Sequence, residues 1–80
     1  MKGDRPLIVH AMWEEEAKVW VATSEDVPGL VTEAPSLDTL IPKLKVMIPE
    51  LLDANGNSAT DEIHFRLLGE INEVVYREAA

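Results

Sequence analysis

Apolar and polar residues follow one another along the first half of the chain in a pattern that predicts three short strands. Residues 6–13 (PLIVHAMW) form an apolar, partly β-branched run, which predicts a strand covered largely on both faces. Residues 14–17 (EEEA), with three consecutive glutamates, interrupt this run before β-type residues resume over 18–24 (KVWVATS), so we expect an antiparallel hairpin. Pro28–Gly29 predicts a type II turn, and residues 30–33 predict a third strand.

The segment after Ser36 has the spacing of a single amphipathic helix. Ser36 is a candidate N-cap, and Asn55–Gly56 supplies a C-terminal stop. Pro42 and Pro49 each remove a backbone donor, so we expect a kink, or a first turn of 3₁₀ type before Pro42. The apolar stripe consists of Leu37, Leu40, Ile41, Leu44, Ile48, Leu51 and Leu52.

Residues 62–68 (EIHFRLL) alternate between apolar and polar positions and predict a half-buried strand. Gly69–Glu70 fits the centre of a type II′ hairpin turn, and residues 71–77 then form either a fifth strand or a flexible or partner-paired tail. The sequence therefore predicts one α+β domain over residues 1–80, in which a three-stranded antiparallel meander and one packed helix are followed by one or two further strands. The sheet face away from the helix must be solvated, paired with a second copy or covered by a partner.

Charge and size narrow the classes of partner. The net charge is −8, with fifteen acidic residues against seven basic ones, so we expect attraction to a basic protein and no direct binding of nucleic acid. A chain this short buries a modest core, which favours a homodimer or a higher homo-oligomer. No apolar run is long enough to act as a signal peptide or to cross a membrane, so we expect a cytoplasmic protein.

The residues that usually carry chemistry are sparse. The chain has no cysteine, which excludes disulfides and thiolate chemistry. His10 and His64 lie in predicted strands and could face each other, but no further metal ligand accompanies them at a suitable spacing. Ser24 and Ser36 have the character of turn and cap residues rather than nucleophiles. We therefore expect no metal and no cofactor, and leave open whether a ligand binds near either histidine.

The aromatic and sulfur-containing residues fit structural positions. Trp13 and Trp20 flank the first turn and could pair across the two strands. Met12 and Met47 fit the role of core filler.

Four segments together resemble the HicB-like antitoxins. They are Trp20–Ser24 (WVATS), Asp26–Leu30 (DVPGL), Val31–Ala34 (VTEA) and the start of the helix at Ser36. The helix segment 43–52 (KLKVMIPELL) is similar to a small subfamily of HicB-like proteins without assigned function. The resemblance covers residues 7–55 for the broad family and most of the chain for the subfamily.

The resemblance implies a partial RNase H-like fold without RNase H activity. HicB proteins bind and inhibit HicA, a small basic ribonuclease toxin, by covering its catalytic surface. Many also carry a C-terminal DNA-binding domain. The segment after residue 56 predicts about one hairpin and fits no such module, so we do not expect operator binding. Separately from the resemblance, the first predicted strand contains no acid that could serve a two-metal nuclease site.

The leading hypothesis is a non-catalytic, HicB-like antitoxin-type protein that binds and occludes a basic HicA-like toxin. One alternative is a stand-alone homo-oligomeric domain with a structural or ligand-binding role, and another is an enzyme that uses His10 or His64. The three glutamates 14–16 could instead form a solvated hairpin tip, because like charges favour exposed positions. The candidate contact residues are Glu14, Glu15, Glu16, Glu25 and Asp26.

Overall fold

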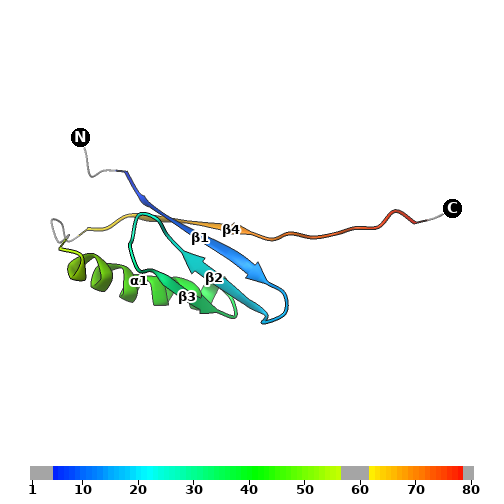
Figure 1. The fold of residues 1–80 in the computed structure, drawn as a ribbon, viewed down its shortest axis with the longest axis horizontal. Coiled ribbons are helices and arrows are strands. Elements are labelled where there is room, and N and C mark those ends of the chain that lie inside the picture. The colour runs from blue at the N-terminus through cyan, green and yellow to red at the C-terminus, as the bar shows by residue number, and fades with distance from the viewer. Residues whose placement is uncertain (1–4, 57–61, 79–80) are drawn as a thin grey trace.

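One four-stranded sheet and one helix make up the fold. The computed structural model describes residues 5–56 and 62–78. Figure 1 shows the helix lying against one face of the sheet, so the predicted α+β architecture and its strand–strand–strand–helix–strand order are confirmed. The elements are β1 (Leu7–Glu14), β2 (Val19–Thr23), β3 (Val31–Ala34), α1 (Leu37–Ala54) and β4 (Phe65–Glu70).

The sheet has the strand order β3-β2-β1-β4. β1, β2 and β3 form the predicted antiparallel meander, while β4 pairs parallel with β1, with Leu7 opposite Phe65 and Met12 opposite Glu70. A parallel neighbour needs a crossover connection, and α1 provides it. The last strand therefore joins the sheet beside the first strand and leaves β3 at the opposite edge.

Close packing of α1 on the sheet depends on three alanines. Ala11, Ala22 and Ala34 are buried on β1, β2 and β3, and their small side chains allow the helix to approach the strands. Each fully buried leucine or isoleucine contributes about 1.5–3 kcal/mol relative to exposure. The helix supplies Leu40, Leu44, Ile48 and Leu52 to this core.

The ends of α1 follow the predicted capping residues. Ser36 Oγ accepts a hydrogen bond from Thr39 N–H at 3.1 Å, and Gly56 has a φ of +79° just beyond the C-terminus. Leu40 N–H donates to Ser36 C=O at 3.0 Å, so the first turn is α-helical and the 3₁₀ alternative is wrong. Pro42 is exposed, so water can solvate the carbonyl group that its missing N–H would have bonded.

The prediction of a hairpin turn at Gly69–Glu70 is wrong. Both residues continue β4, and no strand is assigned to residues 71–78. A Cβ atom on Gly69 would lie 3.4 Å from Cζ3 of Trp20, so this glycine makes room for an aromatic ring that reaches across the sheet. Trp20 also meets Trp13 as predicted, with ring centroids 5.5 Å apart and planes inclined by 62°.

β1 is covered on one face only, so the prediction that both faces are covered is wrong for the single chain. Val9 and Ala11 point into the core, whereas His10 and Met12 lie on the face away from α1. Met12 is 49% exposed and is not core filler, while Met47 packs against the core as expected.

We predict that Gly29→Ala destabilises the protein by about 1–2 kcal/mol, because an L-residue is strained at positive φ. Gly29 has a φ of +88° in the turn closed by Leu30 N–H and Val27 C=O at 3.1 Å. Gly29→Asn should lose less, since asparagine tolerates this region better. Urea unfolding measures both changes, and equal stability of Gly29→Ala and the parent would contradict the assignment.

Candidate interaction surface

The sheet face away from α1, called here the open face, carries apolar side chains, charged side chains of both signs and His10. Two rows of side chains cross it from β4 to β3, because residues in register on neighbouring strands point to the same side. The first row is Glu70, Met12, Val21 and Glu33. The second row is Leu68, His10, Thr23 and Val31. The centre of the first row is therefore apolar, and a carboxylate stands at each end of it.

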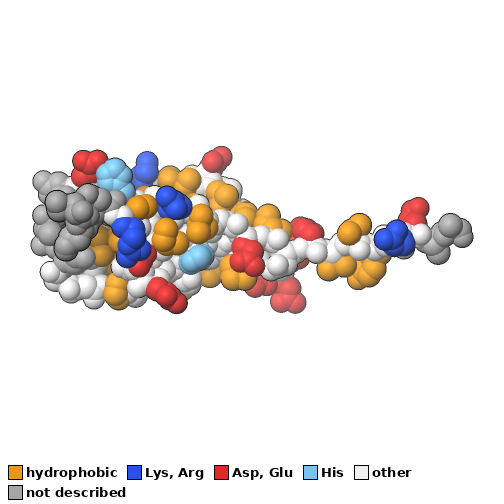
Figure 2. Space-filling view, turned by 90° about the horizontal axis from the view of Figure 1, so that it is seen from above, with side chains coloured by type: hydrophobic (Ala, Val, Ile, Leu, Met, Phe, Trp, Pro, Cys, Tyr) orange, Lys and Arg blue, Asp and Glu red, His pale blue; other side chains and the backbone are white. Residues whose placement is uncertain are grey.

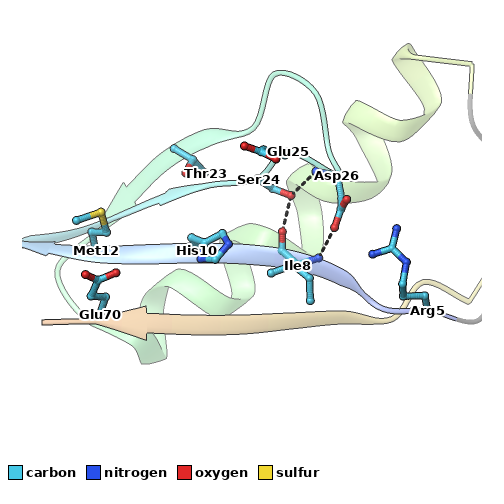
Figure 3. A pocket seen from close by; sticks show the side chains of 9 residues that line it. All are labelled: Arg5, Ile8, His10, Met12, Thr23, Ser24, Glu25, Asp26 and Glu70. Carbon is cyan, nitrogen blue, oxygen red and sulfur yellow. Dashed lines mark hydrogen bonds between the residues drawn. The ribbon is translucent and has the colours of Figure 1, made fainter.

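A hollow of about 610 Å³ lies on the open face between β4 and the loop that follows β2. Figure 3 shows His10 and Met12 side by side along β1, with Glu70 below and Glu25 above them. The remaining lining residues are Arg5, Ile8, Thr23, Ser24 and Asp26. The hollow combines a partly apolar floor with charged residues of both signs.

Ser24 and Asp26 clamp the backbone of Ile8 at one end of this face. Asp26 Oδ2 accepts a hydrogen bond from Ile8 N–H at 2.8 Å, and Ser24 Oγ donates to Ile8 C=O at 2.6 Å (Figure 3). The same Oγ accepts the N–H groups of Asp26 and Val27 at 3.0 and 3.2 Å. These side chains form hydrogen bonds with the backbone of β1 just beyond the end of β2, where no residue of β2 pairs with Ile8. Asp26 is therefore held in place by contacts within the chain.

The hairpin between β1 and β2 has its own internal contacts. Glu15 accepts a hydrogen bond from Trp13 Nε1 at 2.8 Å and forms an ion pair with Lys18. The hydrogen bond from Lys18, followed by that from Trp13, lowers the pKa of the Glu15 carboxyl from its usual value. Lys18 adopts a φ of 59° and its N–H donates to Glu14 C=O at 2.7 Å, which closes the turn. Glu15 thus helps to hold the turn.

The five candidate contact residues do not form one patch. Glu14, Glu15 and Glu16 lie at the β1–β2 hairpin, while Glu25 and Asp26 lie beside Ile8 at the opposite end of β1. Ile8 and Glu14 are six positions apart in β1, which corresponds to about 20 Å of extended chain. Glu14 shares the open face with Met12 by strand alternation. Glu33 and Glu70, which were not among the predicted contacts, border this face directly.

The two histidines do not face each other. His10 pairs in register with Thr23 and Leu68, whereas His64 precedes β4 and its Nε2 lies 2.7 Å from Glu62 Oε2. Among residues 5–56 and 62–78, no group of three or more His, Cys, Asp or Glu side chains is arranged to hold a metal ion. Within the same ranges, no helix is both long and apolar enough to span a membrane.

Residues 71–78, called here the arm, leave the body of the protein in an extended conformation (Figure 1). Figure 2 shows the arm as a narrow projection with apolar side chains along it. Val75 is 92% exposed and Tyr76 is 84% exposed. The radius of gyration is 15.9 Å, against about 12 Å for a compact chain of this length. The sequence signal for the arm is its run of β-type residues, which fits a hairpin strand and a tail equally well.

The comparisons with known proteins identify a family and a solved relative without assigning an activity. A family model described as a domain of unknown function, DUF1902, matches residues 6–77. The crystal structure of a hypothetical protein from the extremely thermophilic bacterium Thermus thermophilus is 49% identical, with a TM-score of 0.76. That match covers 90% of this chain and all of the other. No curated protein matches the chain.

We predict that Ser24→Ala and Asp26→Ala each destabilise the protein by about 1–3 kcal/mol, because each leaves a backbone group of Ile8 without its partner. Glu25→Ala is the matched control between them and should change stability by less than about 0.5 kcal/mol, since it is exposed. Chemical denaturation measures all three. Equal stability of the three variants would show that the clamp does not contribute.

We predict that the Glu15 carboxyl titrates below the usual range for glutamate and that Lys18→Met raises its pKa towards that range. A carboxyl with a lowered folded-state pKa adds stability above its unfolded pKa, and this stability is lost as the pH falls through the folded pKa. Carbon-detected NMR titration of Glu15 in both proteins measures the difference. An identical pKa in the two would contradict the Lys18 contact as its cause.

Proposed function

From the premise that the chain belongs to the DUF1902 family, we propose that it is a non-catalytic, HicB-like binding protein of the antitoxin type. Its partner is a small basic ribonuclease of the HicA type, which it binds and occludes. The observation that carries this proposal is the composition of the open face, where an apolar centre lies between Glu33 and Glu70. A basic partner with an apolar patch would complement this surface in both charge and hydrophobicity.

The overall charge supports the same class of partner. A net charge of −8 accelerates encounter with a basic protein and repels free nucleic acid. An acidic protein that covers a basic RNA-binding surface competes with RNA for the same positive charges. Inhibition therefore needs no catalytic group on this chain.

The contact residues follow from their placement. Glu33 and Glu70 border the apolar centre, and Glu14 and Glu25 are exposed near the two ends of the open face. Asp26 and Glu15 already have partners within the chain, so their main contribution is to shape the two loops. We propose Glu14, Glu25, Glu33 and Glu70 as the charged contacts, with Met12 as the central apolar contact.

The second candidate function, a stand-alone homo-oligomer, is favoured by one separate observation. The arm exposes several apolar side chains that the single chain does not cover. Self-association through the arm would leave Met12 and Glu33 on the open face accessible, so the two functions are compatible, with Glu70 on β4 bordering both surfaces.

The test measures RNA cleavage by a purified HicA-type ribonuclease from the same organism with and without this protein. We predict inhibition at stoichiometric ratio, and a loss of affinity of about tenfold or more for a Met12→Arg/Glu33→Lys double variant. Glu50→Lys is the control, because Glu50 is exposed on α1, away from the open face. Unchanged RNA cleavage in the presence of excess protein would contradict the proposed inhibition. An equal loss of affinity in the double variant and in Glu50→Lys would contradict the open face as the binding surface.

A further inference from the structure

The sheet has one protected edge and one unprotected edge. β3 is only four residues long and Pro35 follows it directly, which are features that hinder pairing with another strand. At the other edge β4 runs into the arm without a proline over residues 65–78. This edge extends for about 46 Å at about 3.3 Å per residue and presents backbone groups that a further strand can bond.

The direction of these backbone groups follows from the β1–β4 ladder. Leu7 N–H donates to His64 C=O at 2.8 Å. The backbone N–H and C=O groups of His64 and of the even-numbered residues of β4 therefore point towards β1. Backbone groups alternate in direction along a strand. The backbone N–H and C=O groups of Phe65, Leu67 and Gly69 therefore point to the unprotected edge. Because the arm is extended, the backbone groups of its odd-numbered residues, from Ile71 to Arg77, point the same way.

We propose that two copies of this chain pair through this edge, each arm lying antiparallel to β4 of the other copy. The two-fold axis passes through Ile71, so that Ile71 of one copy lies opposite Ile71 of the other. The odd-numbered residues face each other as hydrogen-bonded pairs, which gives about fourteen backbone hydrogen bonds between the copies. The two sheets then form one continuous sheet with both helices on the same side. This inference does not rest on the proposed function.

The side chains select this register. With Ile71 on the axis, Leu67 lies opposite Val75 and Leu68 lies opposite Val74. Apolar side chains thus meet on both faces of the new ladder. At the ends His64 lies opposite Glu78, and in between no two like charges are paired. Cross-strand pairs of this kind stabilise a sheet, and opposed like charges destabilise it.

Two neighbouring registers keep the same backbone bonding, and both are poorer. With Asn72 on the axis, Ile71 would lie opposite Glu73, and Glu70 would lie opposite Val74. With Glu70 on the axis, Glu70 would lie opposite Glu70 of the other copy, and Leu67 would lie opposite Glu73. Residues 64–78 pair favourably with an identical segment when Ile71 is on the axis. The strand that binds this edge is therefore a second copy of the same chain. Burial of Val74, Val75 and Tyr76, which are 72%, 92% and 84% exposed in the single chain, provides an apolar contribution.

The test is disulfide cross-linking of single-cysteine variants, which is clean because the natural chain has no cysteine. Opposed residues in a hydrogen-bonded pair have Cα atoms about 5.5 Å apart, within disulfide reach. Ile71→Cys should form a covalent dimer under mild oxidation at micromolar concentration. Val74→Cys is the matched control in the same arm, because Val74 of the two copies would lie about 20 Å apart and should remain monomeric on a non-reducing gel.

The outcomes are distinct. Efficient cross-linking of Ile71→Cys alone supports the proposal. Equal cross-linking of the two variants, or none in either, overturns it, and cross-linking of Glu70→Cys in place of Ile71→Cys overturns the register. Circular dichroism of each variant checks that the exposed substitution leaves the fold intact.

A second measurement uses the mass in solution by light scattering. Val75→Asp should weaken dimerisation by about tenfold or more, because the carboxylate would face Leu67. Val46→Asp is the control, as Val46 is also an exposed apolar residue but lies on α1. Dimers of equal stability in both variants would contradict the proposal. Purified chain alone is used throughout, so failure of toxin inhibition leaves this result unaffected.

Discussion

The packing of one helix against the alanines of the sheet is the contact on which the rest of the structure depends. α1 covers the face that carries Ala11, Ala22 and Ala34 and supplies Leu40, Leu44 and Ile48 to the core. It also connects β3 at one edge to β4 at the other, which makes the parallel β1–β4 pair possible. A single helix cannot cover both faces of a sheet, so α1 leaves the open face uncovered, and β4 lies at an edge of the sheet.

The strands, the helix and their order could be predicted because each depends on local pattern. Ser36 and Asn55–Gly56 mark the ends of α1, and Pro28–Gly29 marks the turn before β3 through a glycine at positive φ. The turn predicted at Gly69–Glu70 was wrong for a physical reason. Glycine is favoured both in tight turns and where a side chain packs closely against the backbone. Here the ring of Trp20 occupies the space over Gly69, and no local pattern reveals that contact.

The candidate site was harder to predict than the fold. Consecutive glutamates at a hairpin suggest an acidic patch, yet the register places Glu14 and Asp26 at opposite ends of β1. The acids that border the open face, Glu33 and Glu70, become neighbours of the same apolar centre only through the sheet register. Similarly, the arm has the composition of a strand whether its partner strand belongs to the same chain or to another, so its sequence could not distinguish the two.

Hydrogen exchange of the arm amides, followed by NMR, reports on the proposed edge pairing around Ile71 residue by residue. We expect alternating protection, in which the amides of Glu73, Val75 and Arg77 exchange slowly because they bond to β4 of the second copy, while those of Val74 and Tyr76 exchange freely. This protection should disappear on dilution below the dimer dissociation constant. Uniformly fast exchange along residues 73–77 at high protein concentration would show that the two copies do not pair through this edge.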